Sequence, residues 1–144
     1  MTLRSSFALL GALVLAGTAT IAYAQGGAKF NASLSGEAEV PGPGDPDGKG
    51  NASITINPGK SELCYKLSVK DIAAATGAHI HTGSTTQAGP VSVGLTAPAA
   101  GSSSGCVTIN SELADAIRKA PQAYYVNVHN AEFPDGAIRG QLDK

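Results

Sequence analysis

Short runs of alternating apolar and polar residues recur from residue 29 onwards, and they restrict the fold more than any other feature of the chain. In 52–56 the isoleucines at every second position alternate with serine and threonine, and 62–69 continues the same pattern. Residues two apart in a strand lie on one face, so such runs predict strands that are buried on one side. Turn-forming sequences separate the runs, among them Asn57-Pro58-Gly59 and Phe133-Pro134-Asp135-Gly136.

Eight such runs are predicted as strands: 29–34, 52–56, 62–69, 78–81, 90–95, 106–109, 123–129 and 137–142. One helix is expected over Ser111–Ala120, with Asn110 or Ser111 as its N-cap and Pro121 ending it. The chain has 144 residues, few aromatic residues, 18 glycines and 8 prolines, which suits short strands joined by tight turns. The sequence therefore predicts an all-β domain: an antiparallel, Greek-key-like β-sandwich or barrel with one short helix.

The N-terminus has the pattern of a targeting segment. Arg4 precedes an apolar run over 7–14, and Ala22-Tyr23-Ala24 fits a cleavage site. We expect a signal peptide over 1–24 and a single domain over 25–144. An uncleaved anchor helix is the alternative, but the apolar run is short and interrupted. The interpretation implies a secreted or periplasmic protein with no membrane span after cleavage.

Charge and motifs exclude several classes of function. Charged residues make up 15% of the chain and the formal net charge is −1, so the basic excess of a nucleic-acid-binding protein is missing. No serine lies in a G-x-S-x-G setting, and no glycine loop is built to hold phosphate. We therefore predict no catalytic residues. The first interpretation is a binding domain for an unknown extracellular or periplasmic protein or ligand.

The two cysteines of the chain are Cys64 and Cys106. In an oxidising compartment an isolated pair forms one disulfide most simply, and two buried free thiols are the alternative. The spacing of the histidines does not suit a zinc site built on these cysteines. A bridge closing this loop would stabilise the fold by about 4 kcal/mol in the chain-entropy model.

All three histidines fall in predicted strands, on the face turned away from the core. His79 and His81 share a face because they are two residues apart, and His129 has the same outward parity in a later strand. Neutral imidazole is a good ligand for copper and zinc, so a site for one copper ion is the alternative function; ordinary surface histidines are the other interpretation. The same parity predicts four further side chains on this outer face: Tyr125, Asn127, Arg139 and Gln141.

Four motifs, taken in order, resemble those of the CHRD (chordin) domain family. They are GAHIHTG at 77–83, GPV at 89–91, YYVNVHN at 124–130 and GAIRGQL at 136–142. The resemblance extends over nearly all of 28–143, including FNASLSGEAEVP at 30–41. It implies an exported domain of the kind repeated in chordin, an extracellular antagonist of growth factors. It implies no settled activity, since the bacterial members of the family are mostly single exported domains without one.

A fainter resemblance is to the copper–zinc superoxide dismutases, which are also Greek-key sandwiches. It implies His79, His81 and His129 as copper ligands and an anion-steering part for Arg139. Val91 stands where that family has its bridging histidine, and no zinc cluster is visible. The resemblance thus implies copper binding with, at most, a weak dismutase-like redox role.

Overall fold

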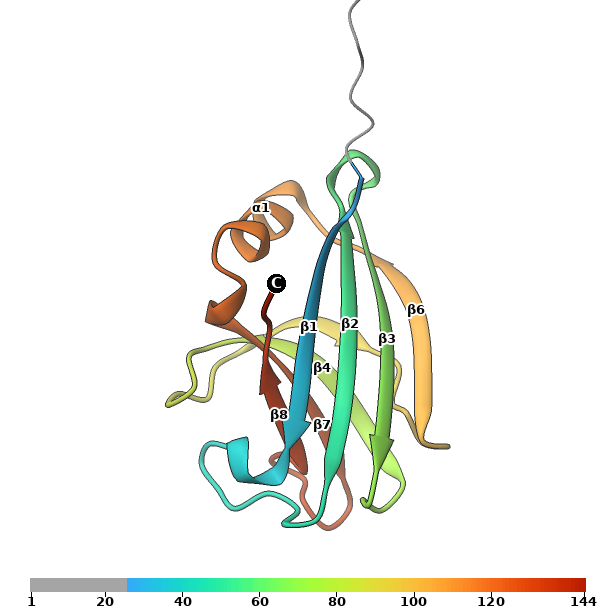
Figure 1. Ribbon diagram of the computed structural model, residues 1–144, viewed down its shortest axis with the longest axis vertical. Coiled ribbons are helices and arrows are strands. Elements are labelled where there is room, and N and C mark those ends of the chain that lie inside the picture. Colours follow the sequence, from blue (N-terminus) through green and yellow to red (C-terminus); the bar gives the residue numbers. More distant parts are fainter. Residues whose placement is uncertain (1–25) are drawn as a thin grey trace, which may run out of the picture.

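The computed structural model describes residues 26–144, which form eight strands and one α-helix (Figure 1). In chain order the elements are β1 (Ala28–Ser35), β2 (Lys49–Asn57), β3 (Glu62–Lys70), β4 (Ala75–Thr82), β5 (Val91–Leu95), β6 (Ser102–Thr108), α1 (Ser111–Lys119), β7 (Tyr124–Asn130) and β8 (Ile138–Gln141). Single 3₁₀ turns occupy Gly36–Ala38, Pro58–Lys60 and Pro121–Ala123. The expected signal peptide over 1–24 and its cleavage site lie outside the described residues.

All eight strands belong to one antiparallel sheet in the order β5-β4-β7-β8-β1-β2-β3-β6. Figure 1 shows how the sheet folds over on itself, with β1, β2, β3 and β6 in front and β4 and β7 crossing behind them. Side chains join its two edges. The Tyr65 hydroxyl on β3 lies 2.9 Å from Thr96 Oγ1, just after β5, and Ser103 on β6 donates a hydrogen bond of 2.7 Å to Thr96 O. The sheet is therefore a nearly closed barrel, and the prediction of an all-β fold is confirmed.

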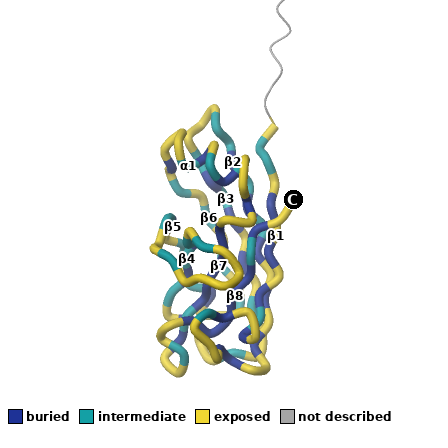
Figure 2. The backbone as a smooth tube through the Cα atoms, turned by 90° about the vertical axis from the view of Figure 1, so that its left-hand side faces the viewer, coloured by how far each residue is buried: buried dark blue, intermediate teal, exposed yellow. Residues whose placement is uncertain are grey.

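Alternation along the strands produces the core. Ile54, Ile56 and Leu63 are completely buried, and their neighbours in sequence face outward. Figure 2 shows buried residues alternating with more exposed ones along the strands. The helix begins where expected, because the Asn110 side chain accepts a hydrogen bond of 2.8 Å from the Leu113 N–H. Ala114 and Ile117 of this helix are buried. The helix lies at one end of the barrel (Figure 1).

The predicted disulfide is present between β3 and β6. Cys64 and Cys106 are register partners with their Cα atoms 3.9 Å apart, and their sulfur atoms are bonded. A disulfide fits an oxidising compartment. Within the part of the chain that the structure describes, no helix is long and apolar enough to cross a membrane.

Candidate functional site

The three histidines converge on the outer side of the β4–β7 pair. In the register, His79 lies opposite Asn127, His81 opposite Tyr125, and His129 opposite Gly77. Ring centroids are 5.1 Å apart for His79 and His129, 5.5 Å for His79 and His81, and 6.2 Å for His81 and His129. One nitrogen from each ring lies within 4.8 Å of the other two. Gly77 lies beside both rings, since a Cβ built on it would be 3.5 Å from His79 Cε1 and 3.7 Å from His129 Cδ2.

Hydrogen bonds to carbonyl groups fix the tautomers of two of the rings, His81 and His129. His81 Nδ1 lies 2.9 Å from Gly89 O, and His129 Nδ1 lies 3.0 Å from Pro134 O. A carbonyl only accepts, so each Nδ1 carries the proton and each Nε2 keeps a lone pair. His81 Nε2, His129 Nε2 and His79 Nδ1 are all buried and have no hydrogen-bond partner among the described residues. The cluster therefore presents three unpartnered nitrogens in one place.

The surroundings keep two of these imidazoles neutral. Burial lowers the pKa of His79, and repulsion from His129 and His81 lowers it further. Burial also lowers the pKa of His81, although its hydrogen bond to Gly89 acts in the opposite direction. Both rings are therefore deprotonated at neutral pH, which is the state that binds metal ions.

Tyr125 and Arg139 build a stack next to the histidines. The rings of Tyr125 and His81 are nearly parallel, with centroids 4.9 Å apart. The Arg139 guanidinium carbon lies 3.5 Å from the Tyr125 ring centroid, a cation–π contact. Because β7 lies between β4 and β8, Tyr125 packs between His81 and Arg139. The stack holds the His81 ring in one orientation.

Three of the four side chains predicted beside the histidines on this outer face are buried. Tyr125, Asn127 and Arg139 are 3%, 3% and 1% exposed. All four side chains lie on the same face of the sheet as the histidines. In the register, Asn127 pairs with both His79 and Arg139, and Tyr125 pairs with both His81 and Gln141. Gln141 is half-buried, as are the three histidines. Alternation separates the two faces of a sheet, but it does not say whether a loop covers the outer one.

The segment between β4 and β5 is the main cover. Arg139 Nη2 donates to the carbonyls of Gln87, at 3.1 Å, and Ser84, and Gln141 Nε2 donates to Gly83 O at 2.9 Å. The Gly89 N–H donates to the Tyr125 hydroxyl at 3.1 Å. These bonds hold 83–89 against β7 and β8. The same loop carries the Gly89 carbonyl that orients His81.

Glu39 is a buried carboxyl group that the sequence analysis did not identify. It comes from the segment between β1 and β2, is 7% exposed, and accepts hydrogen bonds of 2.8 and 2.9 Å from Asn127 Nδ2. Burial raises the pKa of Glu39 to about 7, although the Asn127 hydrogen bond and the positive charge of Arg139 act in the opposite direction. Gly136 leaves room for it, since a Cβ there would lie 2.4 Å from Glu39 Oε2.

A second group of metal-ligating side chains, Glu62, Cys64 and Cys106, lies on β3 and β6. Its two sulfur atoms are bonded to each other, so neither is a thiolate that could bind a metal ion. The histidine cluster is thus the candidate metal centre of the described residues.

Comparison with known protein families identifies the family of the chain. The model of the CHRD domain matches residues 30–142, a range that includes all three histidines and the residues packed around them. The chain belongs to the CHRD domain family. No curated protein and no solved structure matches it. Membership of the CHRD family suggests an extracellular binding domain.

Proposed function

We propose that this CHRD domain is an extracytoplasmic binding domain that holds one copper ion through His79, His81 and His129. One observation carries the proposal: each of the three imidazoles offers a nitrogen within 4.8 Å of the other two, and each has a buried nitrogen without a hydrogen-bond partner among the described residues. A buried polar atom without a partner is unfavourable in a folded protein, and clusters of them require an explanation. A bound cation would satisfy all three at once.

The spacing of the nitrogens is somewhat wider than that of a closed metal site. Metal–imidazole bonds are about 2.0–2.1 Å long, so three nitrogens arranged evenly around one ion are about 3.6 Å apart. The upper limit of 4.8 Å in the cluster exceeds this by about 1.2 Å. Rotations of the half-buried rings would close that difference.

The surrounding groups support the ligands in the manner of known metal sites. Metal-binding histidines usually donate their second N–H to a carbonyl or carboxylate, which fixes the tautomer and the orientation of the ring. Gly89 O and Pro134 O do this for His81 and His129. Tyr125 adds a stacking contact to His81. The proposal therefore includes these partners as well as the three ligands.

The donor set favours copper over other ions. Nitrogen sites bind divalent first-row metals in an order that peaks at copper(II), and magnesium and calcium prefer oxygen ligands. Zinc also accepts imidazole, but lies below copper in that order. Bound copper would supply one-electron redox chemistry.

Titration calorimetry with copper(II) tests the proposal on protein freed of metal by chelation. We expect one ion per chain, with affinity reduced more than about 100-fold in His79→Ala, His81→Ala and His129→Ala, because each loses one ligand. Asn51→Ala is the matched control, since this exposed residue lies on β2, away from the cluster. Binding weaker than millimolar in the wild type, or equal binding in all variants, would reject the copper site. Tighter binding of zinc than of copper would reject the choice of metal.

A further inference from the structure

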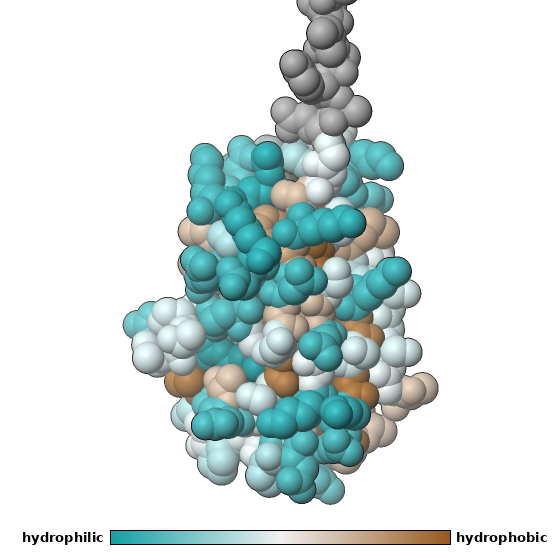
Figure 3. All heavy atoms as spheres, viewed as in Figure 1, coloured by the Kyte–Doolittle hydropathy of each residue, from teal (hydrophilic) through white to brown (hydrophobic). Residues whose placement is uncertain are grey.

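The outer face of β1, β2, β3 and β6 has an unusual composition. Every outward-facing position on these four strands is lysine, serine, threonine, asparagine, cysteine or the single acid Glu62. The lysines are Lys29, Lys49, Lys66 and Lys70. Figure 3 views this face and shows teal and pale side chains over most of it, with brown confined to patches between them. We call this surface the lysine face.

The lysines of this face lack acidic partners. Among the described residues, Arg118 and Asp115 form the one ion pair, and neither is on the lysine face. Lys49 and Lys70 are direct register partners on β2 and β3. Like charges directly opposite one another in a sheet are destabilising. Such a local conflict is of the kind expected at functional sites.

The acidic residues gather elsewhere. The loops 36–48, 71–74 and 131–137 join strands at one end of the barrel (Figure 1), and they contain seven acidic residues and no lysine or arginine. The four strands of the lysine face carry four lysines and one acid in a chain whose formal net charge is −1, although Lys49 and Lys70 adjoin two of the acidic loops. An anionic partner would be attracted to one side of the molecule and repelled from one end.

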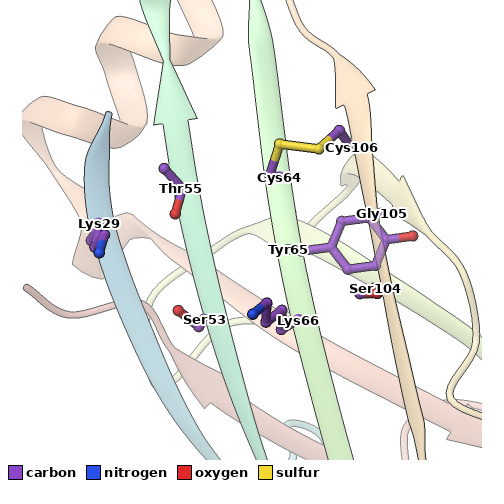
Figure 4. A pocket seen from close by; sticks show the side chains of 9 residues that line it. All are labelled: Lys29, Ser53, Thr55, Cys64, Tyr65, Lys66, Ser104, Gly105 and Cys106. Carbon is purple, nitrogen blue, oxygen red and sulfur yellow. A yellow bond between two sulfur atoms is a disulfide. The ribbon is translucent and has the colours of Figure 1, made fainter. Parts of the chain in front are cut away.

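Connected hollows run along the lysine face. The first, of about 410 Å³, is lined by Lys29, the disulfide and Lys66 among others (Figure 4). The second, of about 390 Å³, shares Ser53 and Lys66 with the first, and a third continues to Lys70. The series follows β3 from Cys64 to Lys70, about 20 Å at the usual rise of a strand. A groove of this length suits a linear polymer.

We propose that the lysine face binds an acidic polysaccharide. The four lysines would pair with carboxylate or sulfate groups spaced along the polymer, and the serine, threonine and asparagine side chains would bond to sugar hydroxyls. Other anionic partners fit less well, because the face has no exposed aromatic or large aliphatic side chain; Val91, the exposed large apolar residue of the described chain, is on β5. Protein partners and single-stranded nucleic acids use aromatic contacts, and peripheral membrane binding uses an inserted apolar face.

Binding of the full domain to immobilised polysaccharides tests this inference. The probes are polygalacturonate, which carries carboxylates, and heparin, which carries sulfates, with neutral dextran as the reference and anionic phospholipid vesicles as a separate arm. We expect binding to at least one acidic polysaccharide at low ionic strength, loss of binding at high ionic strength, and none to dextran. Lys66→Gln with Lys70→Gln should lower the affinity at least tenfold. The control, Lys60→Gln with Lys119→Gln, removes the same charge from exposed positions outside the face and should change it less than twofold.

Several results would overturn the inference. They are no binding to either acidic polysaccharide, equal losses in the two double variants, or binding to the anionic vesicles alone. All four substituted lysines are exposed, so circular dichroism should show an unchanged fold in every variant. The copper site lies on β4 and β7, outside the lysine face, so His79→Ala should bind the polysaccharide as the wild type does. Failure of one proposal therefore leaves the other standing.

Discussion

Replacement of Glu39 by glutamine should make the stability of this domain less dependent on pH. In the folded chain burial raises the pKa of Glu39 to about 7, against an ordinary value of 4.5. Below about pH 4.5 the carboxyl group is protonated in both folded and unfolded chains and favours neither. Between about 4.5 and 7 the unfolded chain loses the proton and the folded chain keeps it, so stability falls as pH rises through this window. Glutamine is neutral at every pH, so the loss of stability between about pH 4.5 and 7 should disappear in the variant.

The size of the effect follows from the width of that window. A difference of about 2.5 pH units at about 1.36 kcal/mol per unit gives an upper limit of about 3 kcal/mol above pH 7. Relaxation and water entry screen the charge, so we expect a gain of about 1–3 kcal/mol. The hydrogen bonding between residues 39 and 127 can be kept in Glu39→Gln. Asn127 Oδ1 has no partner in the wild type. If the Asn127 side-chain amide rotates, its Oδ1 can accept a hydrogen bond from the N–H of the new glutamine.

Urea denaturation of wild type and Glu39→Gln at pH 5 and pH 8.5 measures the difference. The variant should be close to the wild type at pH 5 and more stable at pH 8.5. Contributions of His79 and His81 to the pH dependence are common to both proteins and cancel. Glu37→Gln is the matched control, because Glu37 is exposed and only two residues away. A stability difference that is constant with pH, or that favours the wild type at pH 8.5, would show that burial of the Glu39 carboxyl does not raise its pKa as described.

Three further outcomes are expected. Replacing Cys64 and Cys106 by alanine should lower the free energy of unfolding by about 4 kcal/mol in urea, because the bridged residues are 42 apart in sequence. Tyr65→Phe removes both hydrogen bonds to Thr96 and should cost about 1–3 kcal/mol, with faster amide hydrogen exchange in β5 than in β2. The affinity for copper(II) should fall as pH drops below about 6, because protons compete for the imidazole nitrogens, and calorimetry in buffers of different pH would detect it.

Alternation of apolar and polar residues predicted the strands that are buried on one face only. The alternation over 62–69 predicts β3 almost to the residue, since each apolar side chain there contributes to the core. It misses the start of β2, where Lys49 and Gly50 carry no apolar pattern. Gly50 is buried there because the Ile138 side chain occupies the place of its missing Cβ. That packing depends on β8, which is distant in sequence, so a local pattern cannot reveal it.

The candidate site was predicted in part for a similar reason. Parity puts His79, His81 and His129 on the outer face, but their meeting depends on the pairing of β4 with β7. The burial of Arg139 depends on a loop that folds back over the sheet, and the sequence gives no sign of that path. Glu39 has no periodic or motif signal at all, because its environment comes from residues in β7 and in the β7–β8 turn.

The copper site is tested most directly by imidazole ¹⁵N chemical shifts, measured before and after one equivalent of copper(I), which is diamagnetic. In the metal-free protein, His81 and His129 should carry their proton on Nδ1, as their carbonyl partners require. Copper(I) should then shift His79 Nδ1, His81 Nε2 and His129 Nε2 together. Unchanged shifts in all three rings, or binding through the nitrogens that face Gly89 and Pro134, would contradict the proposed copper site.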